Sequence, residues 1–336
     1  MFNQKKIGVI GAGSFGTALA MVLAGKGHQV TVWARKAEQI EEMKMTGENS
    51  HYLPGVKLPT EIEFTGDLKE ACQNKDYILF AVPAQSFRSV LTDAAKYIDT
   101  AVPIVNVAKG IEKGSLLRLS QVAEEVIPGA RYVALSGPSH AEEVARQLPT
   151  TVAVASKNHD LAVEIQELFI TERFRVYSNE DLAGVELGGA LKNIIALGAG
   201  ISDGLGFGDN AKAAMMTRGI TEMTRLGLTM GADMKTFSGL TGIGDLIVTC
   251  TSMHSRNRRC GILIGEGVNP EEATRRIGMV VEGISTAEAA YALANQYGIE
   301  MPITESIYKV IHREMDARSA VTYLMGREMK NEMHII

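Results

Sequence analysis

The sequence has 336 residues, and at about 150 residues per domain this length predicts two domains. Hydrophobic residues make up 46% and charged residues 22%, which is typical of a folded globular protein and excludes a disordered or fibrous chain. The formal net charge of −5 makes the surface repel polyanions, so we expect no nucleic-acid partner, and any bound anion needs a local basic pocket. Cys72, Cys250 and Cys260 are too few and too scattered for a disulfide framework, which predicts a reducing, cytoplasmic location.

Residues 7–25 form an uncharged, mostly apolar run that superficially resembles a signal peptide or a membrane anchor. Three glycines divide this run into a short strand, a turn and a helical stretch. That division favours the start of a βαβ unit, so we expect no membrane insertion.

The first 180 residues alternate short β-branched runs with helix-like segments, the pattern of a parallel sheet covered by helices on both faces. The expected strands are 6–10, 29–33, 77–82, 103–107, 132–135, 151–155 and 173–177. Beyond residue 179 the chain is typical of consecutive helices, with Asn269 as an N-cap before Pro270. The sequence therefore predicts an α/β fold, with a domain built on a mostly parallel sheet, 1–185, and an all-helical domain, 186–336.

A G-x-G-x-x-G motif, Gly11, Gly13 and Gly16, lies between the first expected strand and an apolar helix. In dinucleotide-binding folds the first glycine allows the tight turn, the second lets the backbone approach a pyrophosphate, and the third allows the helix to pack on the strand. We expect these three glycines to bind a dinucleotide, which makes the α/β domain, 1–185, a Rossmann-type dinucleotide-binding domain. The alternative is a structural turn with glycines present by chance.

The second expected strand ends in Arg35 and Lys36, and no acid follows until Glu38. An acid at this place reads the ribose of NAD, whereas an arginine accommodates the 2′-phosphate of NADP. The pattern predicts good use of NADPH, with NADH possible in addition. The alternative is a solvated pair of cations at the start of the next helix.

Two later strands end in polar residues at the carboxyl edge of the sheet, where ligands of open α/β folds bind. Lys109 follows one of them and is a candidate ligand-contacting cation. Gly137, Pro138 and Ser139 follow the next, at a helix start whose N–H groups suit an anion. A plain N-cap at Ser139 is an equally good interpretation.

Residues 186–196 predict a helix that is apolar nearly all round except for Lys192 and Asn193. Such a helix is buried, and Gly188 and Gly189 let another backbone or a ligand come close. Desolvation would lower the pKa of Lys192 and fit it for proton transfer near neutral pH. The alternative is a lysine that reaches solvent at the domain boundary.

Residues 255–259, Ser-Arg-Asn-Arg-Arg, combine arginines with serine and asparagine donors, as phosphate recognition requires. The alternative is a solvated basic helix face. No metal site is expected, since Cys250, His254 and Cys260 lack a second close pair of ligands.

Taken together, these stretches resemble the bacterial NAD(P)-dependent sn-glycerol-3-phosphate dehydrogenases over essentially the full length. The resemblance is carried by the motifs at 11–18, 106–112, 136–139, 187–193, 240–246, 255–259 and 281–283. It implies a C-terminal domain like that of 6-phosphogluconate dehydrogenase, NADP and NAD as cofactors, a cytoplasmic location and a homodimer. The implied reaction is the reversible reduction of dihydroxyacetone phosphate to sn-glycerol 3-phosphate for phospholipid synthesis.

The resemblance also implies roles for single residues. Besides the three glycines, the implied cofactor contacts are Ser14, Phe15, Arg35, Lys109, Ala141, Arg256, Val280 and Glu282. The implied substrate contacts are Lys109, Gly137, Ser139, Lys192, Asp245, Ser255, Arg256 and Asn257. Among them Lys192, Lys109 and Asp245 are the expected catalytic residues: Lys192 would protonate the developing alkoxide, Asp245 would orient that lysine, and Arg256 with Asn257 would clamp the phosphate.

Two positions depart from the family pattern, namely Phe15, where Trp or Tyr is frequent, and His140, where Phe is usual. Two other functions stay open on the residues alone. A β-hydroxyacid or 6-phosphogluconate dehydrogenase would act on a carboxylate, and a dinucleotide-sensing module would bind without catalysis.

Overall fold

The computed structural model describes residues 4–329, 331 and 332. Its contacts divide the chain into two compact units, Met1–Ala108 with Leu119–Leu182, and Lys109–Arg118 with Ala183–Ile336. The segment Lys109–Arg118 therefore packs with the helical unit, although the sequence placed it in the N-terminal domain. The reason is that Ile111 is fully buried in the core of the helical unit. The limits predicted for the two domains, 1–185 and 186–336, stay a prediction.

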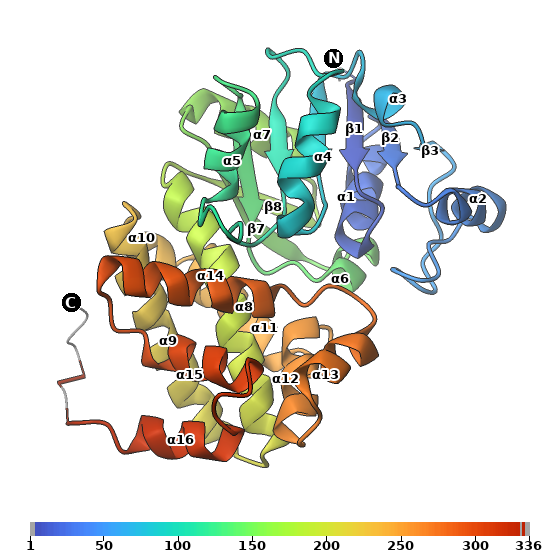
Figure 1. Cartoon of the computed structure of the whole chain (residues 1–336). Helices are drawn as coiled ribbons and strands as arrows, with labels where there is room; N and C mark the ends of the chain where they lie inside the picture. Colours follow the sequence, from blue (N-terminus) through green and yellow to red (C-terminus); the bar gives the residue numbers. More distant parts are fainter. Residues whose placement is uncertain (1–3, 330, 333–336) are drawn as a thin grey trace. The chain divides into compact units, whose positions relative to one another are not determined.

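The first unit is built on one eight-stranded sheet with the order β3-β2-β1-β4-β5-β6-β7-β8 (Figure 1). Every neighbouring pair of strands is parallel except β6 and β7, which are antiparallel. The strands are β1 (Lys6–Ile10), β2 (Gln29–Trp33), β3 (Ile62–Thr65), β4 (Tyr77–Phe80), β5 (Ile104–Asn106), β6 (Tyr132–Ser136), β7 (Thr150–Ala155) and β8 (Phe174–Asn179).

All seven predicted strands overlap an observed strand, and two points need correction. Strand β3 was missed because it lies at the edge of the sheet and alternates apolar with polar residues instead of forming an apolar run. The antiparallel direction of β7 was not predicted, since a strand buried on both faces has the same apolar composition in either direction.

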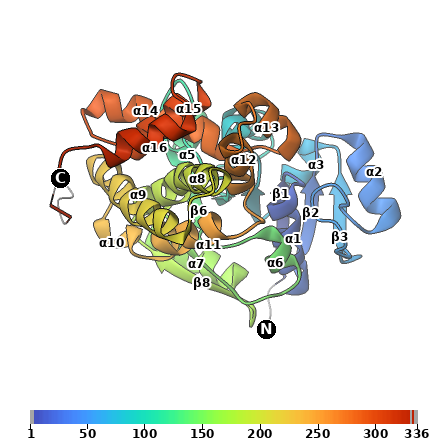
Figure 2. The same cartoon turned by 90° about the horizontal axis from the view of Figure 1, so that it is seen from below.

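Helices cover both faces of this sheet, as predicted (Figures 1 and 2). Helix α1 packs with α6 and α7, while α4 packs with α3 and α5, and these two groups lie on opposite faces. The helices are α1 (Ser14–Gly25), α2 (Ala37–Thr46), α3 (Leu68–Cys72), α4 (Phe87–Ala94) preceded by the 3₁₀ turn η1 (Ala84–Ser86), α5 (Leu119–Val126), α6 (Ala141–Ala145) and α7 (His159–Phe169).

In the residues that the structure describes, the regular secondary structure of the second unit is all helical, apart from one isolated bridge in its first segment. The predicted N-cap at Asn269 is confirmed, because its side chain accepts a hydrogen bond from Glu271 N and Pro270 opens the helix. The helices are α8 (Leu182–Gly204), α9 (Asp209–Thr229), α10 (Met234–Phe237), the π-helical turn η2 (Leu240–Gly244), α11 (Asp245–Thr251), α12 (Arg256–Gly265), α13 (Pro270–Ile277), α14 (Glu282–Tyr297), α15 (Pro302–Ile311) and α16 (Ala317–Met325).

Helix α8 is the central helix of this unit. By length and composition it could cross a membrane, but 89% of its most apolar window is buried inside the protein, as expected of a core helix. Small residues, not large apolar ones, set its spacing to α12. A Cβ at Gly200 of α8 would lie 2.1 Å from Arg258 O, and a Cβ at Gly261 of α12 would lie 2.1 Å from Leu197 O. The two backbones are therefore in direct contact (Figure 2).

Candidate functional site

The glycine turn after β1 has the geometry that a dinucleotide needs. A Cβ at Gly11, whose φ is +119°, would lie 2.5 Å from Ala81 O, and a Cβ at Gly16 would lie 2.0 Å from Gly11 O. The fold itself therefore requires these two glycines. A Cβ at Gly13 would meet no atom within 4 Å, so Gly13 faces open space at the N-terminus of α1. No side chain caps that helix start, and its N–H groups suit a pyrophosphate.

The predicted ribose-reading position lies beside this turn. Gly11 N donates a hydrogen bond to Trp33 O at 3.0 Å, which joins the glycine turn to the end of β2. Arg35 is exposed two residues further on, and Lys36 is the N-cap of α2 without a side-chain capping bond. The first acid, Glu38, lies inside α2. The residues present thus fit a dinucleotide, and the role of Arg35 stays a prediction.

The turn after β6 is tight at Gly137. Its φ is +137°, and a Cβ there would lie 3.0 Å from the Cα of Val152. Ser139 Oγ donates to Gly137 O at 3.0 Å, and the N-cap of α6 is His140. The alternative interpretation of Ser139 as a plain N-cap is therefore wrong. Ala141, an expected cofactor contact, is the buried first residue of α6.

The helical unit brings together the three predicted catalytic residues. Lys192, on α8, is 6% exposed, and its Nζ lies 3.0 Å from Asp245 Oδ1. Lys109 Nζ lies 2.6 Å from the other carboxylate oxygen, Oδ2. Thr249 completes the group, because Lys192 Nζ donates to its Oγ1 at 2.7 Å. The alternative in which Lys192 reaches solvent is therefore wrong.

The first residue of α11 is Asp245, directly after the π-helical turn η2. Two glycines allow this turn to pack closely. A Cβ at Gly242 would lie 1.9 Å from Phe237 O of α10, and a Cβ at Gly188 of α8 would lie 2.6 Å from Thr241 O of the turn. The close approach predicted from the glycines in α8 is thus explained at Gly188. It places α11, with Asp245 and Thr249, against the helix that carries Lys192.

The electrostatics of this group follow from its burial. Burial lowers the pKa of Lys192 from 10.5 to about 8; the Lys109 charge acts in the same direction, and Asp245 opposes it. Burial alone would raise the pKa of Asp245, but the ammonium groups of Lys109 and Lys192 outweigh it and lower that pKa. Near neutral pH the group therefore contains a fixed carboxylate and a lysine that can exchange its proton.

A chain of amide hydrogen bonds connects this group to α12 and α14. Asn193 donates from Nδ2 to Lys109 O at 3.3 Å and accepts from Asn257 Nδ2 at 2.9 Å. Asn257 Oδ1 accepts from Gly283 N at 2.9 Å. Asn257, a predicted phosphate ligand, thus already connects three helices through its own side chain.

The predicted arginine cluster separates into different roles. Ser255 is the N-cap of α12, where its Oγ accepts from Arg258 N at 3.2 Å. Arg258 itself donates to Asp203 Oδ2 at 2.8 Å and to Thr251 O at 2.7 Å, so it is engaged within the protein. Arg256 is exposed in the first turn of α12. The phosphate-binding prediction therefore rests on Arg256 and the start of α12.

Two further predicted cofactor contacts lie at the start of α14. Val280 is 44% exposed, and Glu282 is the half-buried first residue of the helix.

Cys250 and Cys260 are buried thiols that form no disulfide. Within the described part of the chain, no group of three or more His, Cys, Asp or Glu side chains could hold a metal ion.

The chain matches two family models in sequence. Residues 6–162 match the NAD-dependent glycerol-3-phosphate dehydrogenase N-terminus, and residues 181–322 match the C-terminus of the same family. A glycerol-3-phosphate dehydrogenase [NAD(P)+] of Pelotomaculum thermopropionicum is 54% identical over 98% of this chain and 95% of its own. The Bacillus subtilis protein of that name is 52% identical over 98% and 96%. The chain belongs to the NAD-dependent glycerol-3-phosphate dehydrogenase family.

Solved structures agree with this membership. The crystal structure of glycerol-3-phosphate dehydrogenase from Coxiella burnetii superposes with a TM-score of 0.93 at 42% identity, and the match covers 96% of this chain and 99% of that one. The predicted fold class, a Rossmann-type α/β unit followed by a helical unit, is therefore confirmed for this family member.

Sequence reasoning gave no role to Thr249 or Asn193 in this dehydrogenase. The signal for Thr249 was available, since it lies four residues after Asp245 and therefore on the same face of α11. Asn193 was noted only as a polar neighbour of Lys192. Its contacts join segments far apart in the sequence, and no local pattern predicts them.

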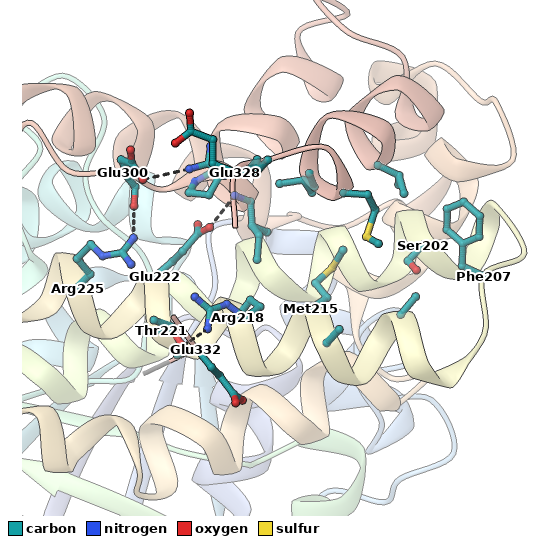
Figure 3. A pocket seen from close by; sticks show the side chains of 18 of the residues that line it. Ser202, Phe207, Met215, Arg218, Thr221, Glu222, Arg225, Glu300, Glu328 and Glu332 are labelled. Atoms are coloured by element: carbon teal, nitrogen blue, oxygen red, sulfur yellow. Dashed lines mark hydrogen bonds and ion pairs between the residues drawn. The ribbon is translucent and has the colours of Figure 1, made fainter. Parts of the chain in front are cut away.

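A separate pocket of about 520 Å³ lies on the helical unit of this dehydrogenase (Figure 3). Residues of α9, α15 and α16 line it, and none of the predicted site residues does.

The Glu222 carboxylate, which lines this pocket, accepts hydrogen bonds from Ile303 N at 2.7 Å and Thr304 N at 3.1 Å, so it caps the start of α15. Burial raises the pKa of Glu222 to about 7, although these hydrogen bonds act in the opposite direction. This carboxylate is therefore a buried structural cap.

Proposed function

We propose that this protein reduces dihydroxyacetone phosphate to sn-glycerol 3-phosphate, reversibly, with NADPH or NADH as the reductant. The observation that carries the proposal is the group formed by the buried Lys192 and Asp245 with Lys109, which is partly buried. Family membership supplies the substrate, and this group supplies the proton that carbonyl reduction requires.

The first unit would hold the dinucleotide through Gly11, Gly13 and Gly16 and the N–H groups at the start of α1. Ser14, Phe15 and Ala141 are further proposed contacts. Arg35, exposed after β2, would pair with a 2′-phosphate, which favours NADPH over NADH. When bound, the reduced nicotinamide supplies a hydride for the carbonyl carbon.

In the helical unit, Lys192 would protonate the carbonyl oxygen as negative charge develops on it. A pKa near 8 keeps the lysine mostly protonated at neutral pH and still able to release its proton. Asp245 and Thr249 accept two of its three N–H bonds, which fixes the direction of the ammonium group. Lys109 pairs with the second carboxylate oxygen of Asp245. It also adds a positive charge that would stabilise the carbonyl oxygen as this oxygen becomes negative.

The phosphate of the substrate would bind at the start of α12, where Arg256 is exposed and Ser255 and Asn257 fix the first turn. Gly137 and Ser139 in the first unit are further proposed substrate contacts, and Val280 and Glu282 are further proposed cofactor contacts. We also propose a homodimer, a cytoplasmic location and a role in supplying glycerol 3-phosphate for phospholipids.

The test is the loss of absorbance of the reduced nicotinamide with purified protein and dihydroxyacetone phosphate, run in parallel with NADPH and NADH. Rapid oxidation is expected, faster with NADPH at low cofactor concentration. A panel of 2-keto and 3-keto acids is the control. Turnover of a keto acid, but not of the triose phosphate, would contradict the proposal. Tight cofactor binding without any turnover would favour a sensor.

A further inference from the structure

The segment Lys109–Arg118, which carries Lys109, folds back on itself. Ile111 and Arg118 form an isolated antiparallel bridge, and Glu112 N donates to Leu117 O at 3.0 Å. Leu116 turns the chain with a φ of +59°. The bridge places the backbone of Arg118 opposite Ile111, only two residues from Lys109. Whatever holds Arg118 therefore also restrains the chain next to Lys109.

A largely buried ion pair holds Arg118. Its Nη1 lies 2.6 Å from Glu186 Oε2, and the side chains are 15% and 7% exposed. Glu186 belongs to α8, less than two helical turns before Lys192. A buried ion pair recovers little more than its desolvation cost, so stability alone is a weak reason for its presence. Its more specific effect is geometric, because it fixes the segment to the helix that carries Lys192.

The other end of the segment is attached to the same helix. Asn193 Nδ2 donates to Lys109 O at 3.3 Å, and Ile111 is fully buried. The main chain of Lys109 is thus held from both sides, and its ammonium group reaches Asp245 Oδ2 at 2.6 Å.

We propose that Arg118 and Glu186 are positioning residues that hold Lys109 against Asp245 and thereby tune the proton exchange of Lys192. This inference rests on the proposed function, since it assigns a part in the same proton transfer. If the pair is broken, the segment loosens and the Lys109 ammonium spends less time beside Asp245. Lys192 then loses a neighbouring like charge, so its pKa rises.

The experiment compares the full-length wild type with Arg118→Gln and Glu186→Gln, using the dependence of kcat/KM for dihydroxyacetone phosphate on pH from 6 to 10. We expect kcat/KM to fall about tenfold. The pH at which kcat/KM declines on the alkaline side of the profile should rise by about half a pH unit or more. Arg118→Lys keeps the positive charge. It should retain most of the wild-type activity, and its kcat/KM should decline at nearly the same alkaline pH as in the wild type.

Lys212→Gln is the matched control, because Lys212 forms a similarly buried pair with Asp203 in the same unit, at 2.8 Å. It should leave the pH profile unchanged. If the single variants do not fold, Arg118→Met combined with Glu186→Leu keeps the volume and leaves no unpaired charge. The double variant should fold, and its kcat/KM should still decline at a higher alkaline pH than in the wild type.

Two outcomes would overturn the inference: full activity in folded variants, or lower activity with a wild-type pH profile, which is what a merely structural role would give. Absence of turnover by the wild type would instead contradict the proposed function, so the two failures are distinguishable.

Discussion

Replacement of Lys192 by methionine separates catalysis from stability in this protein. Methionine fills a similar volume but carries no charge and donates no hydrogen bond. In the wild type, Lys192 and Lys109 place two positive charges beside one buried carboxylate. After Lys192→Met, one positive charge faces one negative charge, so Asp245 keeps a counter-ion.

The stability change follows from the pKa of Lys192, which burial lowers from 10.5 to about 8. The difference corresponds to about 3 kcal/mol of unfavourable free energy for the protonated lysine in the folded state. Because the folded pKa is below the unfolded one, this cost is complete below pH 8 and disappears as the pH rises through 10.5. At pH 7 the methionine variant should therefore be as stable as the wild type or up to about 3 kcal/mol more stable.

The activity should move in the opposite direction. Loss of a positioned general acid costs a factor of about 10² to 10⁴ in kcat. Cofactor affinity should hardly change, because Lys192 is not among the proposed cofactor contacts. The expected variant is thus inactive, folded and at least as stable as the wild type.

The assay combines nicotinamide absorbance for kcat, fluorescence titration for the affinity for NADPH, and urea unfolding at pH 7. Lys212→Met is the control, since Lys212 is a partly buried lysine paired with Asp203 outside the site. It should keep wild-type turnover. A Lys192→Met variant with more than about a tenth of wild-type kcat would refute the catalytic role, and a clear loss of stability would refute the electrostatic reasoning.

Three further predictions concern other parts of the chain. Arg35→Glu should raise the KM for NADPH at least about tenfold with little effect on the KM for NADH; equal effects would contradict the 2′-phosphate contact. Because Glu222 has a pKa of about 7 when folded and 4.5 when unfolded, the unfolding free energy should fall as the pH rises from 4.5 to 7. Urea melts of Glu222→Gln should lack this slope. Gly200→Ala should destabilise by about 2 kcal/mol or more, whereas Gly25→Ala, where a Cβ meets no atom within 4 Å, should be tolerated in the same melts.

Much of the fold was predictable because burial leaves a local trace. A strand covered on both faces is a continuous apolar run, and a helix without a polar face has to be buried, which placed Lys192 in the interior. Strand β3 left no such trace, since one of its faces is polar. Because α8 has no polar face, the alternative in which Lys192 reaches solvent was wrong.

The parts of the site that escaped prediction are those that depend on pairing across the sequence. Arg118 and Glu186 are 68 residues apart, and Asn193 and Asn257 are 64 apart. Each is an ordinary polar residue in its own neighbourhood. The first pair forms only when the segment Lys109–Arg118 packs on α8, and the second only when α8 packs on α12.

The glycine contact between α8 and α12 restricts how this enzyme could change its specificity. Where two backbones touch, no side chain can shorten or lengthen to adjust the distance between them. The lysine on one helix and the first turn of the other therefore keep a fixed separation, whatever substitutions accumulate around them. A new substrate would have to be accommodated by changing side chains at the ends of these helices, because the frame that carries them has no intermediate spacing to adopt.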